Sequence, residues 1–153
     1  MTAADVPAHY READRAARII LIAESYQRLL GRDLVPAEAD MISALWHAPL
    51  AVVAHGTEAD PVFFFGNRAA LAAFDSTPED FAMMPSRLSA EAPLRDERQA
   101  LLDRVTQHGF IDDYAGIRIS AKGRRFAISG AAVWNLIDGQ GMHRGQAAAF
   151  AAP

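Results

Sequence analysis

The first third of the chain has the pattern of amphipathic helices. From residue 8 to residue 30, apolar side chains recur at the three- and four-residue spacing of one helix face. The face expected to be buried consists of Ile19, Ile22, Ala23, Tyr26, Leu29 and Leu30. Gly31 ends this helix, and a second helix is predicted over residues 36–47, because Pro49 prevents its continuation. The chain is therefore predicted to be helical up to residue 48.

The pattern after residue 48 is dominated by strands. Five strand-like runs cover residues 50–55, 62–65, 110–120, 125–136 and 143–150. The first two flank a turn-rich segment and predict a hairpin. Between the second and third runs, short helices are predicted over residues 68–74 and after a capping box of Ser76 and Glu79. A longer helix is predicted from about Leu94 to His108.

This order of elements is that of a PAS-like α+β fold. Five strands would form one antiparallel sheet in the spatial order 2-1-5-4-3, with short helices on one face and the amphipathic helices added at the N-terminus. We predict one domain over residues 1–153, with N-terminal helices over 1–48 and a PAS-like core over 49–150. A cone-shaped α+β fold of the nuclear transport factor and ketosteroid isomerase type is the main alternative. The early hairpin favours PAS.

The fourth strand predicts two different faces. Phe126, Ile128, Trp134 and Leu136 have one parity, whereas Ala127, Ala131 and Val133 have the other. The face with large residues suits a core or a pocket. The face with small residues suits the first helix or a second subunit.

Composition and charge narrow the class of function. The net charge of -4 argues against a nucleic-acid partner, which normally requires a basic surface. No cysteine is present, so disulfides, thiolate chemistry and a cysteinyl-flavin adduct are excluded. We find no apolar signal region and no run of about 18 apolar residues, and we expect a cytoplasmic protein without membrane insertion.

Several strings in the second half are more specific than the pattern. They are AHGTEADPVFFFGNRAALAAF (54–74), PSRLSAEAPLRDERQALLDRV (85–105), GFIDDYAGIRISAKGRRF (109–126), VWNLID (133–138) and GQAAAF (145–150). Together they resemble the MEKHLA domain family from about residue 25 onward, although the literal string behind that name is missing. The resemblance implies a PAS-like fold. Members occur alone in bacteria and at the C-termini of plant homeodomain leucine-zipper factors, where a sensory role has been suggested.

We therefore expect a non-catalytic sensory or regulatory module that binds a small ligand, mediates protein interaction, or does both. A homodimer or a partner protein fits this role. In PAS domains a ligand lies between the sheet and the short helices. The predicted wall of this site is Phe65, Trp134 and Gln146, with Arg118 and Arg87 as anchors for a carboxylate, because a guanidinium matches two oxygens at once.

Two cofactors stay open as alternatives. Gln146 lies where flavin-binding PAS domains of the LOV type place a glutamine, so flavin could bind noncovalently. His108, on the predicted apolar face of the long helix, could ligate haem, although a helix C-terminus favours histidine without any metal. The residues His55, Glu58 and Asp60 match no metal site, and we expect a solvated loop there.

Two alternatives to a ligand sensor remain. One is a dimerisation module without a ligand. The other is a cone-type isomerase or hydratase-like enzyme, which needs a buried carboxylate beside a tyrosine such as Tyr114. The basic cluster of Lys122, Arg124 and Arg125 is expected to be ordinary surface at a hairpin tip.

Overall fold

The computed structural model describes residues 6–90 and 95–153. The elements, in chain order, are η2 (Ala8–Arg11), α1 (Ala13–Leu30), α2 (Met41–Trp46), β1 (Ala51–His55), β2 (Phe63–Gly66), α3 (Arg68–Ala73), α4 (Pro78–Phe81), η3 (Ser86–Ser89), α5 (Arg95–His108), β3 (Phe110–Ile119), β4 (Arg125–Ile137) and β5 (His143–Phe150). The predicted order of elements is confirmed. The predicted helix start at Leu94 lies outside the described residues.

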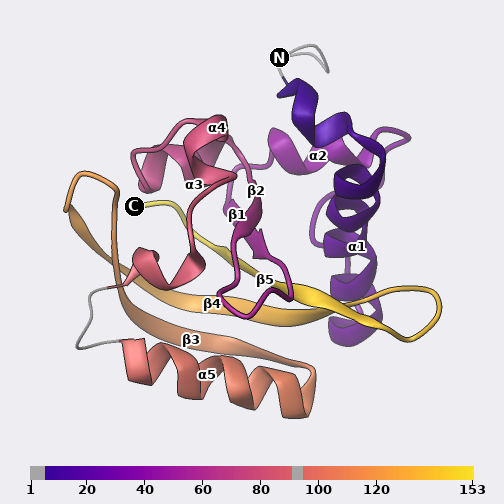
Figure 1. Ribbon diagram of the computed structural model, residues 1–153. Helices are drawn as coiled ribbons and strands as arrows, with labels where there is room; N and C mark the ends of the chain where they lie inside the picture. Colours follow the sequence, from indigo (N-terminus) through magenta and orange to yellow (C-terminus); the bar gives the residue numbers. More distant parts are fainter. Residues whose placement is uncertain (1–5, 91–94) are drawn as a thin grey trace.

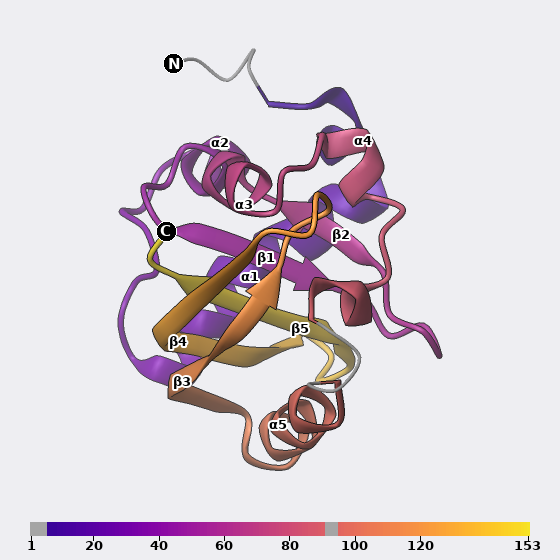
Figure 2. The same cartoon turned by 90° about the vertical axis from the view of Figure 1, so that its left-hand side faces the viewer.

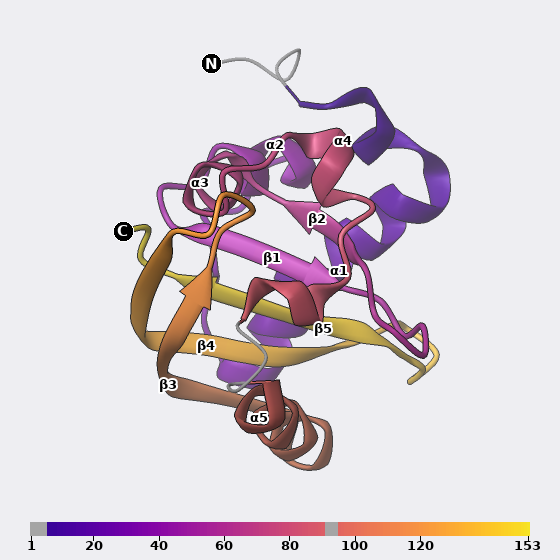
Figure 3. The ribbon, with the colours of Figure 1, turned by 60° about the vertical axis from the view of Figure 1, so that its left-hand side comes forward.

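The strands form one antiparallel sheet in the order β2-β1-β5-β4-β3 (Figure 1). The last strand therefore lies in the middle and pairs with both β1 and β4. This is the α+β PAS arrangement that the sequence predicts. Figure 3 shows α1 behind the strands and η3 in front of them, and Figure 2 shows α5 beside β3 and β4, far from β2.

Helix α1 packs on the sheet through the predicted face. Ile19 and Ile22 are fully buried, and the ring of Tyr26 meets the ring of Trp134 edge to face at 4.8 Å. The Trp134 Nε1 also donates a hydrogen bond of 3.1 Å to the Ile22 carbonyl. The helix ends at Gly31, whose left-handed φ of 73° suits a residue without a Cβ. The N-terminal helices and the sheet thus share one hydrophobic core.

The two faces of β4 differ from the predicted ones. Phe126 packs against Phe74, on the side of the short helices, whereas Trp134 lies against α1. Between them Gly130 has a φ of 61°, and the pairing of β3 with β4 shifts register. An extra residue in a strand reverses the parity of everything that follows. The expected grouping of Trp134 and Leu136 with Phe126 and Ile128 is therefore wrong, as is the small-residue face expected on this strand.

Asn67 joins three elements at the start of α3. Its Nδ2 donates to the Leu45 and Leu50 carbonyls at 3.0 and 2.8 Å, and its Oδ1 accepts from the amides of Val52 and Ala70, both at 3.0 Å. The side chain is fully buried. One amide therefore satisfies backbone groups of α2, of the α2–β1 connection, of β1 and of α3 itself. Helix α4 is capped by Thr77 rather than by the predicted Ser76.

The N-terminal segment covers the outer edge of β2. The buried Tyr10 hydroxyl donates to the Gly66 carbonyl at 2.9 Å and accepts from the Gly66 amide at 3.1 Å. Arg15 donates to the Phe64 carbonyl at 2.9 Å. An edge strand offers unpaired backbone groups, and here side chains of η2 and α1 satisfy them.

Candidate ligand site

A small cavity lies between the sheet and the segments that pass over its inner face. Its volume is about 50 Å³. The wall is mainly apolar, with Phe63, Ile128, Val133 and Phe150 from the sheet and Phe74 from the end of α3. The polar groups are few and are contributed by His55, Ser89, Tyr114, Arg118 and Gln146. This composition is typical of sites for small molecules.

Gln146 connects this cavity to α5. It is 4% exposed, and its Nε2 lies 3.1 Å from the Leu102 carbonyl, 3.0 Å from the Thr106 Oγ1 and 3.1 Å from the Asn135 Oδ1. Two amide hydrogens are thus shared among three acceptors, two of which belong to α5. Asn135 reinforces the link, because its Nδ2 donates to the Val105 carbonyl at 2.9 Å. These contacts hold α5 against β4 and β5.

A second hollow of about 430 Å³ lies on the outer side of Gln146. It is lined by the loop of residues 56–61, by η3 and by α5. His55, Leu102 and Gln146 line both spaces, so they form the boundary between the inner cavity and this outer groove. His143, at the groove, lies 3.4 Å from the Asn135 Oδ1, and burial lowers the pKa of its imidazole.

Arg118 faces the cavity from β3. It pairs with Phe126 across the sheet, whereas its neighbour Ile117 lies on the other face and is 40% exposed. The guanidinium carbon lies 5.1 Å from the centre of the Tyr114 ring. Burial lowers the pKa of Arg118, and the nearby Tyr114 opposes that shift. An arginine remains charged at neutral pH even so.

Gly116 makes this stacking possible. It lies between Tyr114 and Arg118 on the same strand, and a Cβ at this position would overlap the Tyr114 hydroxyl. Glycine therefore lets the tyrosine ring lie along the strand toward the guanidinium. Tyr114, Gly116 and Arg118 form one continuous inward face of β3, which we call the β3 shelf.

The structure separates the five predicted site residues. Gln146 and Arg118 line the cavity. Arg87 lines the outer groove and pairs with Asp60 at 3.0 Å, in an exposed ion pair. Phe65 and Trp134 lie on the opposite face of the sheet. They therefore do not form the predicted cavity wall together with Gln146.

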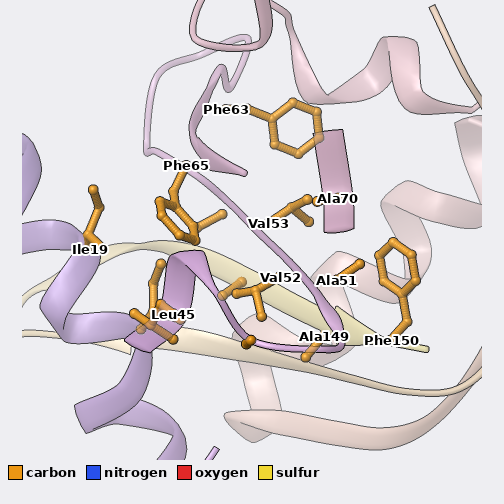
Figure 4. Packing of buried hydrophobic residues seen from close by; sticks show 14 of the residues in the cluster. Ile19, Leu45, Ala51, Val52, Val53, Phe63, Phe65, Ala70, Ala149 and Phe150 are labelled. Carbon is orange, nitrogen blue, oxygen red and sulfur yellow. The ribbon is translucent and has the colours of Figure 1, made fainter. Parts of the chain in front are cut away.

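The position of Phe65 has a local cause. Ala54 pairs with Phe65 and His55 with Phe63, so Phe64 is an extra residue in β2. Figure 4 shows Phe65 on the side of Ile19, and Phe63 on the side of Ala70.

Sequence reasoning also missed Asn135 and the contacts of α5 with Gln146. A glycine within a strand, such as Gly130, is the signal that would have revealed the shifted face.

The cofactor and metal alternatives receive little support from the geometry. A cavity of about 50 Å³ is far smaller than the roughly 300–1,000 Å³ of typical cofactor sites, so a flavin ring does not fit. His108 is exposed, contrary to its predicted place on the apolar face of α5, and it is not among the residues that line the cavity. Within residues 6–90 and 95–153, no group of three His, Cys, Asp or Glu side chains could hold a metal ion.

The remaining charged candidates have structural partners. Glu58 accepts from the Val62 amide at 3.3 Å. Arg124 donates to the Ala73 carbonyl at 2.8 Å and lies 3.4 Å from Asp75, so the β3–β4 hairpin tip is attached to the end of α3. In the part of the chain that the structure describes, no helix is long and apolar enough to cross a bilayer.

Comparison with known proteins gives a consistent result. The model of a family described as the MEKHLA domain matches residues 16–152. The homeobox-leucine zipper protein ATHB-8 of Arabidopsis thaliana is 30% identical over 122 residues, which are 76% of this chain and 14% of that protein. The chain spans about 15% of the length of the curated relatives it matches.

Solved structures show the same fold at low sequence identity. The PAS domain of a protein from Colwellia psychrerythraea has a TM-score of 0.62 and 10% identity, and the match covers 74% of this chain and 93% of that one. An RNA-binding light-oxygen-voltage receptor has a TM-score of 0.60 and 14% identity, over 72% of this chain and 31% of that one.

Proposed function

The chain belongs to the MEKHLA domain family and has the PAS fold, and we propose that it is a non-catalytic sensory or regulatory module whose inner cavity takes a small ligand. The observation that carries this proposal is the position of Gln146. Its amide lies at the wall of the cavity and at the same time holds α5 through Leu102 and Thr106. Occupancy of the cavity and the position of α5 are therefore physically linked.

The proposed signal is a change in the attachment of α5. A ligand with a polar group competes for the Gln146 amide, whose two hydrogens already serve three acceptors. Besides Gln146, α5 is held by the Asn135 amide and by Leu101 and Val105, which are the buried residues along it among the side chains that the structure describes. A ligand that binds more tightly when α5 is released shifts the population toward that arrangement.

The output of such a module requires another protein. We extend the proposal to a homodimer or a partner protein in the cytoplasm, in keeping with a net charge of -4 that disfavours nucleic acid. Ile20 and Ile117 are 37% and 40% exposed and offer apolar surface for such contacts. Light scattering of the purified chain tests the homodimer.

An enzyme of the isomerase type finds less support. It would require a carboxylate close to Tyr114. The residues that line the cavity within the described part of the chain include no aspartate or glutamate. Binding without turnover is the function that this chemistry supports.

The test compares Gln146→Leu with Gln140→Leu, since Gln140 is an exposed glutamine in the β4–β5 turn. Hydrogen exchange should become faster in α5 for the first variant and stay unchanged for the second. Native mass spectrometry of the wild type should show a bound small molecule that Gln146→Leu retains less well. Equal protection of α5 in both variants, or a wild type that binds no small molecule, would support a ligand-free interaction module instead.

A further inference from the structure

Arg118 differs in its partners from the arginines that form ion pairs with aspartate. Arg11, Arg87, Arg124 and Arg144 each lie within 3.4 Å of an aspartate. Arg118 has no such carboxylate among the described residues: its Nη1 donates to the Ile117 carbonyl at 3.2 Å, next to it in the chain, and its side chain forms a hydrogen bond with that of Tyr114. Arg118 is half-buried, and an anionic partner stabilises a cation that is partly removed from water.

The surroundings of Arg118 suit an anion that the chain does not supply. Among the charged side chains of aspartate, glutamate, lysine and arginine, Arg118 is the one found in the cavity lining of the described residues. On the β3 shelf, the guanidinium carbon lies 5.1 Å from the centre of the Tyr114 ring, and the hydrogen bond between the two side chains restrains the guanidinium. A guanidinium held in this way presents two parallel N–H groups, the geometry that binds a carboxylate in bidentate fashion.

The size and polarity of the cavity limit the rest of the ligand. About 50 Å³ exceeds the 10–15 Å³ or so that one water needs, yet it accommodates only about three to five non-hydrogen atoms. The wall beyond Arg118 is apolar, with Ile128, Val133 and Phe150. We propose that the cavity binds a small monocarboxylate with a short apolar chain, with the carboxylate held by Arg118 and the chain packed on these three residues.

This inference rests on the proposed function and names the class of ligand. Propionate is the probe, and propionamide is its neutral control of the same size. Methyl NMR of the wild type should show saturable shifts of Ile128, Val133 and Ala148 with propionate, and at least about tenfold weaker binding of propionamide, because a bond to a charged group is lost. Equal binding of the two, or no binding of propionate, would overturn the inference.

The variants locate the anchor. Arg118→Gln should weaken propionate at least about tenfold, whereas Arg87→Gln, at the exposed ion pair with Asp60, should leave it unchanged. Unchanged propionate affinity in folded Arg118→Gln would also refute the anchor. If that variant does not fold, the comparison of propionate with propionamide on the wild type decides alone.

The outcomes separate this inference from the proposed function. A neutral molecule found in the purified protein, with faster exchange of α5 in Gln146→Leu, would leave the sensory module in place and refute the carboxylate. Failure of both experiments would refute the module as well.

Discussion

Replacing Tyr10 by Phe should cost more stability than its small chemical change suggests. The hydroxyl serves both backbone groups of Gly66, at 2.9 and 3.1 Å, and the side chain is 1% exposed. Removing it leaves a buried N–H and a buried C=O without partners, at about 1–3 kcal/mol each. We expect the free energy of unfolding to fall by about 2–5 kcal/mol in urea titrations.

The pKa of Tyr10 adds a pH dependence to this prediction. Burial raises it from 10.0 to about 12, so ionising this hydroxyl in the folded state costs about 2–3 kcal/mol. Because the folded pKa is raised, this stabilisation is complete below pH 10 and is lost as the pH rises through about 12. The wild type should therefore lose stability over this range, and Tyr10→Phe should lose less.

Tyr26→Phe is the matched control. Its hydroxyl accepts one bond of 3.1 Å from the Arg32 Nε and serves no backbone group, so its removal should cost less than about 1 kcal/mol. Two results would refute the reasoning. One is a loss of less than about 0.5 kcal/mol in Tyr10→Phe at neutral pH, and the other is an alkaline unfolding curve identical to that of the wild type.

Three further predictions concern other parts of the core. Asn67→Ala should lower the free energy of unfolding by about 3–5 kcal/mol in urea, because four backbone groups lose their partner; a loss below about 1 kcal/mol would contradict this. Trp134→Phe should cost about 1–2 kcal/mol through its bond to Ile22 yet leave propionate binding unchanged by calorimetry, and a weakened affinity would return Trp134 to the ligand site. Burial lowers the pKa of His143 from 6.5, so its contribution to stability is complete above pH 6.5 and is lost as the pH falls. The melting temperature should therefore drop less at acid pH in His143→Gln than in the wild type.

The sequence predicted the strands and the first helix well, because their signals are local. The observed bounds of β1, β2, β3, β4 and β5 agree with the predicted runs to within one residue at each end. The predicted buried face of α1 is confirmed at Ile19, Ile22 and Tyr26. Periodicity is a property of neighbouring residues, so it survives without knowledge of the fold.

The site was predicted less well, because it depends on irregularities and on distant partners. Two extra residues, Phe64 in β2 and one near Gly130 in β4, decide which aromatic side chains face the cavity. The role of Asn135 depends on α5, about 30 residues earlier in the chain. Arg118 lines the cavity, but parity alone could not fix which face of β3 it occupies.

The irregularity at Gly130 makes β4 a strand that tolerates no change of length. Shortening it there by one residue would turn Trp134 and Leu136 toward the cavity, and Val133 and Asn135 toward α1. Such a deletion would take the Trp134 indole out of the core beside α1. It would also take the Asn135 amide away from its contact with α5. We therefore expect relatives that keep this architecture to vary in length at the turns, such as residues 56–61 and 138–142, and to keep a bulge in the fourth strand.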